Sequence, residues 1–206
     1  PSISINIRYC RPQEIHDAVR VGQCDLGILS YPQTWRDVAF IPLRDEPMAV
    51  VCSPRHPLAG SGAVQASDLG AWQMVAFEPE LPVARKIKSY LRDQGVEPDI
   101  VNVFDNIDTI KSAVAGTDRI SILPKRAVLR EVAAGVLDVV EIEPELVRPM
   151  GIIHRKRNGS HSGSSRKSFT PAIQAFIDFL IEHAGTQADV VDEADAKGRQ
   201  MVGGKV

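Results

Sequence analysis

The chain has 206 residues, 44% of them hydrophobic, which is enough for one sizeable domain or two small ones with buried cores. Its formal net charge is −2 at pH 7, whereas a DNA-binding module usually presents a basic face, so nucleic acid is not expected as a direct partner. No apolar run reaches 18 residues, so the sequence predicts no membrane span.

The three cysteines, Cys10, Cys24 and Cys52, follow no metal-binding or redox spacing, and their odd number disfavours a disulfide framework. We therefore expect reduced thiols in a cytoplasmic protein. The chain opens at Pro1, without a methionine or a signal peptide, directly before the strand-like residues SISINI. It is therefore expected to be a fragment of a longer protein.

Short apolar segments, many of them β-branched, have the pattern of strands and are separated by helical patterns. Such an alternation predicts an α/β fold with mainly parallel sheets. The expected strands are residues 3–7, 25–30, 38–43, 48–53, 72–77, 99–104, 119–123, 137–142 and 149–154.

Five helices are indicated by apolar residues at helical spacing, and each has a recognisable start or stop signal. Four of them stop at a glycine, which favours the left-handed conformation that often ends a helix. The fifth follows Thr170-Pro171, an N-cap with proline at the first helical position. The four glycines are Gly22, Gly95, Gly116 and Gly135.

Two segments lack any periodicity. Residues 155–167 are basic and rich in glycine and serine, which favours a flexible loop, with a phosphate or nucleic-acid patch as the alternative. Residues 186–206 are too polar to bury much surface and read as a disordered tail.

Polar residues gather just before the helical pattern in FDNIDTIKSAVAG, residues 104–116. Asn106, or Asp105 if the boundary slips by one, is expected to cap the free N–H groups of that helix. Open α/β sheets also bind their ligands at such junctions of strand, loop and helix, so the same residues are candidates to face a ligand. Capping and ligand contact are compatible, and both readings remain open here.

Enzyme signatures are missing from the sequence. The five histidines are scattered, and no GxSxG, P-loop, GxGxxG or HExxH pattern occurs. Glu78 and Glu80 are close in sequence, but Pro79 between them favours a solvated turn over a catalytic pair. We therefore predict no catalytic residue, no metal site and no cofactor.

Several segments, in this order, resemble the effector-binding (substrate-binding) domain of LysR-type transcriptional regulators. No single motif is diagnostic, but their order over residues 1–183 makes the resemblance specific. The segments are VRVGQCDLGIL, EPMAVVCSPRHPLAG, DTIKSAVAGTDRISILP, GVLDVVEI and FTPAIQAFIDFL.

This resemblance implies an α/β fold of the two-lobed type 2 periplasmic-binding-protein class, with lobes joined by two crossover strands and a small effector in the cleft. The crossovers are expected at 48–53 and 149–154. Lobe one is expected at 1–48 plus 150–185, and lobe two at 49–149.

The sequence departs from the family in two places. The winged helix-turn-helix, the linker helix and the first strand–helix unit of lobe one are missing before Pro1, so lobe one should expose an apolar edge. The turn before Leu123-Pro124 keeps Gly116 but has Asp118-Arg119-Ile120 where the family usually has further glycines, so the backbone path of this turn is not predicted.

The resemblance also implies which residues line the cleft. Arg11 is expected to pair with an anionic effector, because its guanidinium matches carboxylate geometry. Asn106 and the free N–H groups behind it are expected to bind the same ligand. Glu78 would repel an anion or pair with an amino group. The full set is Cys10, Arg11, Gln13, Ser30, Tyr31, Phe77, Glu78, Asn106 and Ile107.

The expected function is sensing of a small, anionic metabolite by a domain that passes the change to DNA-binding heads in a homodimer or homotetramer. DNA would be bound only through the absent N-terminal domain, and no membrane partner is expected. Two alternatives remain, a periplasmic solute-binding protein of a transport system and an enzyme on the same bilobal fold.

Overall fold

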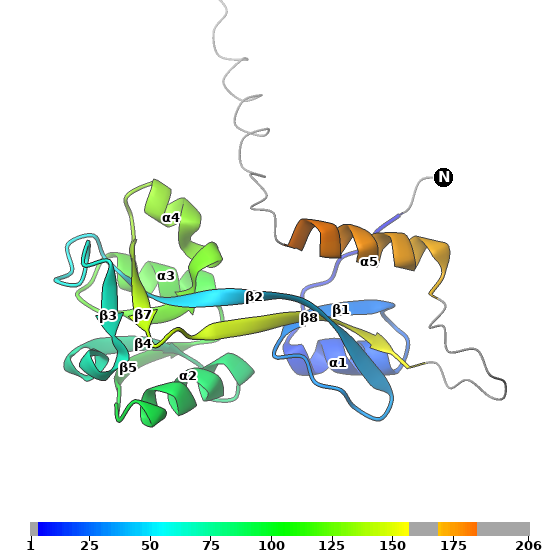
Figure 1. Ribbon diagram of the computed structural model, residues 1–206, viewed down its shortest axis with the longest axis horizontal. Helices are drawn as coiled ribbons and strands as arrows, with labels where there is room; N and C mark the ends of the chain where they lie inside the picture. Colours follow the sequence, from blue (N-terminus) through cyan, green and yellow to red (C-terminus); the bar gives the residue numbers. More distant parts are fainter. Residues whose placement is uncertain (1–3, 157–168, 185–206) are drawn as a thin grey trace, which may run out of the picture. The chain divides into compact units, whose positions relative to one another are not determined.

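The computed structural model describes residues 4–156 and 169–184. Residues Arg8–Asn158 form one compact unit, which holds the eight described strands and the helices α1 to α4 (Figure 1). The α-helices are α1 (Pro12–Arg20), α2 (Pro82–Asp93), α3 (Ile107–Ala115), α4 (Leu129–Ala133) and α5 (Pro171–Ala184), and two short 3-10 helices are η1 (Ala66–Ala71) and η2 (Lys125–Val128). The strands are β1 (Leu26–Ser30), β2 (Val38–Cys52), β3 (Ala63–Gln65), β4 (Gln73–Phe77), β5 (Asp99–Phe104), β6 (Ser121–Pro124), β7 (Asp138–Glu143) and β8 (Val147–Arg155).

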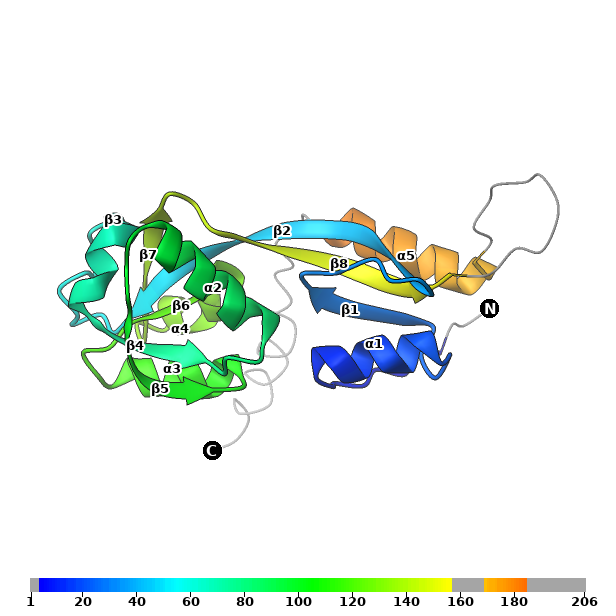
Figure 2. The ribbon, with the colours of Figure 1, turned by 90° about the horizontal axis from the view of Figure 1, so that it is seen from below.

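Two lobes of this unit are connected by β2 and β8, as predicted for the two-lobed fold (Figure 1). The two strands pair antiparallel from Val38 opposite Arg155 to Pro47 opposite Val147. The first lobe contains α1, β1 and the adjoining halves of β2 and β8. The second lobe contains the elements from β3 to β7 and the C-terminal half of β2 (Figure 2). The expected crossover segments overlap these strands but extend into the lobes: residues 48–52 are the part of β2 that pairs with β6 and β7, and residues 150–154 are the part of β8 that pairs with β1.

The second lobe holds the larger core. The C-terminal half of β2 pairs with β6 and β7, and its residues from Met48 to Cys52 are almost completely buried. Helix α2 places Val83, Ile87 and Leu91 on that core, because residues spaced by four lie on one helical face. Strands β4 and β5 form a separate parallel pair beside it (Figure 2).

The first lobe has a small core. It is built from Val19 of α1, Val38 of β2 and Ile153 of β8, with Ile15 and Leu29 packed against them. Strand β1 pairs only with β8 among the described strands and ends the strand order of the sheet.

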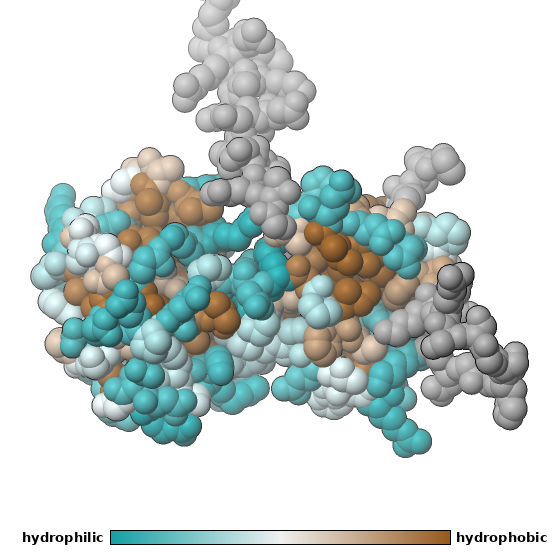
Figure 3. Space-filling model, in the orientation of Figure 1, coloured by the Kyte–Doolittle hydropathy of each residue, from teal (hydrophilic) through white to brown (hydrophobic). Residues whose placement is uncertain are grey.

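Helix α5 belongs to the chain's other compact unit. The N–H of Ile173 donates to Oγ1 of Thr170 at 3.4 Å, which confirms the predicted N-cap. Figure 3 shows hydrophobic surface over α5, where Phe179 and Ile181 are about half exposed. Most of the predicted basic loop and the whole predicted tail, 186–206, lie outside the described residues.

Two strand predictions are wrong. Residues 4–7 form no strand, and Ile5 and Ile7 are more than half exposed, because a strand needs a hydrogen-bonded neighbour that the apolar pattern cannot supply. The segments 38–43 and 48–53 belong to one continuous strand. Its register shifts between Pro42 and Arg44, a position where a strand tolerates proline.

The expectation of mainly parallel sheets is also wrong. Strand β2 pairs antiparallel with β6, β7 and β8, and β1 pairs antiparallel with β8. Among the described residues, parallel pairing is confined to β3 with β7 and β4 with β5, apart from a bridge between Met74 and Ile120. The alternation of helices and strands predicts βαβ units correctly, but not strands that cross between lobes.

The turn between α3 and β6 follows a path without extra glycines. Gly116 has an ordinary φ of −105°, and Oγ1 of Thr117 donates to the carbonyl of Ala113 at 2.9 Å. The same oxygen accepts from the N–H of Arg119 at 3.3 Å. A hydroxyl side chain therefore supports the turn in which the family usually has glycines.

Candidate functional site

The N-terminus of α3 is capped by Asn106, as the sequence predicts. Oδ1 of Asn106 accepts a hydrogen bond from the N–H of Thr109 at 2.8 Å, and the Asn106 backbone is extended. Its amide Nδ2 donates to Oδ1 of Asp105 at 2.9 Å. Asn106 therefore fixes both the start of the helix and the position of the neighbouring carboxylate.

Arg11 connects the first lobe to this helix start. It is the N-cap residue of α1, whose first helical position is Pro12. Its Nη2 lies 3.3 Å from Oδ2 of Asp105 and 3.9 Å from Oε2 of Glu78. A cation from one lobe thus faces two carboxylates from the other.

The electrostatics of this group keep Asp105 ionised. The hydrogen bond from Asn106 is the largest influence and lowers the pKa of Asp105. Desolvation opposes it, but the hydrogen bond and charge of Arg11 add to the lowering, so the pKa lies below its ordinary value. The Arg11 side chain is 65% exposed, and those of Glu78 and Asp105 are 37% and 46% exposed. These three charged groups are therefore open to exchange with a solute.

Tyr31 follows β1 and has an unusual backbone, with a φ of 53°. Its N–H donates to the carbonyl of Pro149 at 2.8 Å, and its ring packs on the core of the second lobe. Its hydroxyl is buried and has no hydrogen-bond partner among the described residues. Burial raises the pKa of Tyr31, and the charge of Arg148 partly opposes the increase.

A buried ion cluster lies on the two crossover strands beside Tyr31. Glu46 is 3% exposed and accepts from Nε and Nη2 of Arg44 at 2.9 and 2.6 Å. It also accepts from Nε of Arg148 at 3.1 Å. Burial alone would raise the pKa of Glu46, but the hydrogen bonds and charges of Arg148 and Arg44 together lower it. No motif predicts this cluster, although the run of charges Arg44-Asp45-Glu46 inside an apolar strand pattern is a usable signal.

The other predicted site residues do not all join the Arg11 group. Phe77 is buried in the core of the second lobe, and Ile107 packs against that core. The Gln13 amide donates to Asp17 on its own helix at 3.5 Å. Cys10, which precedes Arg11 in the chain, and Ser30 are partly buried, and the side chain of neither makes a hydrogen bond to Arg11 among the described residues. The sequence indicates Asp105 only as an alternative cap of α3, and no motif in it predicts the contact with Arg11.

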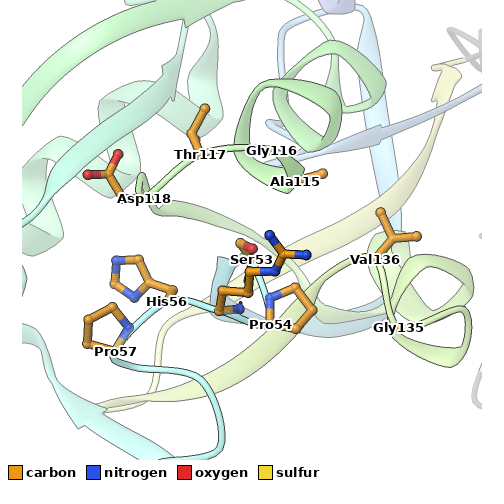
Figure 4. Close-up of a pocket in the computed structure, with 11 residues that line it drawn as sticks. Ser53, Pro54, His56, Pro57, Ala115, Gly116, Thr117, Asp118, Gly135 and Val136 are labelled. Carbon is orange, nitrogen blue, oxygen red and sulfur yellow. Dashed lines mark hydrogen bonds between the residues drawn. The ribbon is translucent and has the colours of Figure 1, made fainter.

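A separate pocket of about 800 Å³ lies within the second lobe, at the other end of α3 (Figure 4). It is formed by the turn at 53–57, the turn at 115–118 and the residues Gly135 and Val136, and it contains none of the predicted site residues. The carboxyl end of a helix carries partial negative charge and Asp118 adds a full one, whereas Arg55 in the same lining adds a positive charge. The charges around this pocket therefore largely balance, and all of its lining comes from one lobe.

His56 borders that pocket, and its contacts are structural. Its Nδ1 accepts from the N–H of Leu58 at 3.1 Å, and its ring packs on Trp72 with centroids 4.5 Å apart. Burial lowers the pKa of His56, although the nearby Asp118 opposes this effect. Nε2 makes no hydrogen bond of normal geometry to the described residues. We therefore take the Arg11 group, to which both lobes contribute, as the candidate site.

Metal and membrane features are not found in the described part of the chain. No three His, Cys, Asp or Glu side chains there come together as metal ligands would. Each helix described falls short of the length and apolarity that a membrane crossing requires.

Comparison with known proteins gives consistent matches. The family model described as LysR substrate binding domain matches residues 1–185. The chain is 30% identical over 115 residues to the HTH-type transcriptional regulator CysB of Haemophilus influenzae, covering 55% of this chain and 36% of CysB. It is 25% identical over 179 residues to the transcriptional dual regulator OxyR of Escherichia coli, covering 86% of this chain and 58% of OxyR. The chain spans less than two thirds of either relative.

Solved structures agree with the fold. The regulatory domain of Synechocystis CcmR in complex with 2-PG has a TM-score of 0.71 and 21% identity, covering 86% of this chain and 81% of that one. The effector-binding domain of QuiR in complex with shikimate has a TM-score of 0.69 and 24% identity, covering 85% and 78%. HinK from Pseudomonas aeruginosa has a TM-score of 0.76 and 20% identity, covering 90% and 61%. At these identities the likeness establishes the fold.

Proposed function

The chain belongs to the LysR substrate-binding domain family, and from this premise we propose that it senses a small effector for a DNA-binding transcriptional regulator. The proposed effector carries a negative group and binds between the lobes. Residues 1–48 plus 150–185 would form lobe one, and 49–149 would form lobe two.

One observation carries this proposal. Arg11 directly precedes α1 in the first lobe, and Asp105 and Asn106 directly precede α3 in the second, yet Nη2 of Arg11 and Oδ2 of Asp105 are 3.3 Å apart. The first N–H groups of a helix lack intrahelical partners and favour a negative ligand, and a guanidinium pairs well with a carboxylate. A negative group bound here would contact both lobes at once.

Effector binding at this position would alter the relative population of lobe arrangements. We propose that the change passes through a homodimer or homotetramer to DNA-binding heads outside this chain, in the cytoplasm. The matched relatives are named as transcriptional regulators, which favours this role over a solute-binding protein of a transport system or an enzyme. The ligands named with CcmR and QuiR support a small-molecule effector.

A ligand screen by thermal shift, followed by calorimetry, tests the proposal. Small organic acids, phosphorylated acids and amino acids form the panel. A ligand at 100 times its Kd is expected to stabilise the protein by about 2.7 kcal/mol. Arg11→Gln should then weaken binding of the hit by about tenfold or more, because a charge-assisted hydrogen bond to the ligand is lost.

Two variants make this test specific. Asn106→Ser keeps a good helix cap but removes the amide, so it should lower ligand affinity with little loss of stability. Arg92→Gln removes an exposed arginine of α2, 74% exposed, and should leave affinity unchanged. A hit that binds Arg11→Gln and Asn106→Ser as tightly as the unaltered protein would place the effector elsewhere.

A further inference from the structure

Negative charge exceeds positive charge around Arg11. Its guanidinium faces Asp105 at 3.3 Å and Glu78 at 3.9 Å, and its own N–H donates to Oε2 of Glu14 at 3.3 Å. In the absence of a ligand, the single positive charge of Arg11 is therefore already surrounded by three carboxylates.

A simple anion would meet a penalty at this position. To pair with Arg11 it must displace Asp105, which then faces both the new anion and Glu78 without its cation. Like charges at such short range repel, and Asp105 is held in place by Nδ2 of Asn106 at 2.9 Å. The anion therefore gains one ion pair only by breaking another.

A ligand with both charges avoids that penalty. Its carboxylate pairs with the guanidinium of Arg11. Its ammonium pairs with Oε2 of Glu78 and with Oδ2 of Asp105, the oxygen that Arg11 releases. An ammonium has three donors, so it can serve both carboxylates. Every charge in the cleft keeps an opposite partner, and the two lobes become joined through the ligand.

We propose that the effector is a zwitterion of the amino-acid type, with its carboxylate on Arg11 and its ammonium between Asp105 and Glu78. This inference rests on the proposed function, since it assumes that the effector binds in the cleft. It adds that Asp105 and Glu78 select the ligand by its amino group.

Matched ligands on the protein and on one double variant test this. Calorimetry is run with the standard L-amino acids and, in parallel, with small carboxylic acids that lack the amino group and amines that lack the carboxylate. We expect an amino acid to bind at least tenfold more tightly than its matched acid and its matched amine. Glu78→Gln combined with Asp105→Asn should weaken binding of the amino acid by tenfold or more and strengthen binding of the matched acid.

The outcomes separate this inference from the proposed function. A carboxylic acid that binds as tightly as its amino acid, with dependence on Arg11, would overturn the zwitterion and leave cleft binding intact. Binding of the amino acid that is unchanged in the double variant, or failure of every amino acid to bind, would also overturn it. A ligand affinity that depends neither on Arg11 nor on the two carboxylates would overturn the proposed function too. The single variant Glu78→Gln repeats the test if the double variant folds poorly.

Discussion

At the scale of single residues, Gly27 is fixed by packing in the small core of the first lobe. A Cβ at this position would lie 2.4 Å from Cγ2 of Ile15 and 3.0 Å from Cγ1 of Ile153. Gly27→Ala should therefore lower the free energy of unfolding by about 1–3 kcal/mol, as overpacking of a close-packed core does. Denaturant unfolding measures the loss. Gly116→Ala is the matched control, because its Cβ would meet nothing within 4 Å, and equal stability of the two variants would contradict the argument.

At the scale of elements, the pairing of β2 with β8 includes the buried carboxylate of Glu46. Its folded pKa lies below the ordinary value of 4.5, so its contribution to stability is present above that pH and is lost as the pH falls through the folded pKa. Glu46→Gln should cost about 1–3 kcal/mol at pH 7, because the ionic hydrogen bonds from Arg44 and Arg148 are weakened. The variant's stability should then fall less steeply below pH 4.5 than that of the unaltered protein.

Unfolding curves measured from pH 7 to pH 3 check this difference. The exposed Glu145, which lies just before β8, gives the control Glu145→Gln, whose pH profile should parallel the unaltered one. Parallel profiles for Glu46→Gln as well would show that the cluster adds no pH-dependent stability.

The same elements show how far local pattern predicts this fold. Asn106 and Thr170 were predicted as caps and do cap, because capping depends on neighbours within one helical turn. Strand β3 has three residues, too few for any alternation to be read. The continuity of β2 is hidden in the sequence because Arg44 and Glu46 interrupt its apolar pattern, and the burial of Glu46 depends on Arg148, about a hundred residues away in the chain. Local signals therefore predict where elements lie, whereas pairing is decided by distant partners.

At the scale of the whole molecule, local sequence signals predict the separate residues of the site but not their contacts. The sequence and the family resemblance indicated Arg11, Glu78 and Asn106 separately, each at the end of a strand or the start of a helix. The contact of Arg11 with Asp105 joins residues 94 positions apart and depends on how the two lobes meet. No spacing in the sequence encodes that distance. The effector role of these residues stays a prediction.

The link between the lobes through Arg11 should depend on salt. All three charged side chains are more than one third exposed, so their attraction is screened by ions, over about 8 Å at 0.15 M salt and about 3 Å at 1 M. Arg11→Gln should increase the mean distance between the lobes in the absence of ligand, and 1 M salt should do the same to the unaltered protein. The thermal midpoint should change little, because exposed ion pairs contribute little to stability.

Fluorescence energy transfer measures this opening, with labels carried by unnatural amino acids at the exposed positions Arg20 on α1 and Lys86 on α2. The control is Arg92→Gln, because Arg92 is exposed and pairs with its neighbour Asp93 in the second lobe. This variant should leave the transfer efficiency and its salt dependence unchanged. In Arg11→Gln the salt dependence should disappear, because the ion pair is already broken. Transfer that is insensitive to both salt and Arg11 would mean that β2 and β8 alone set the lobe spacing, so that an effector must act by bending these strands instead of replacing an ion pair.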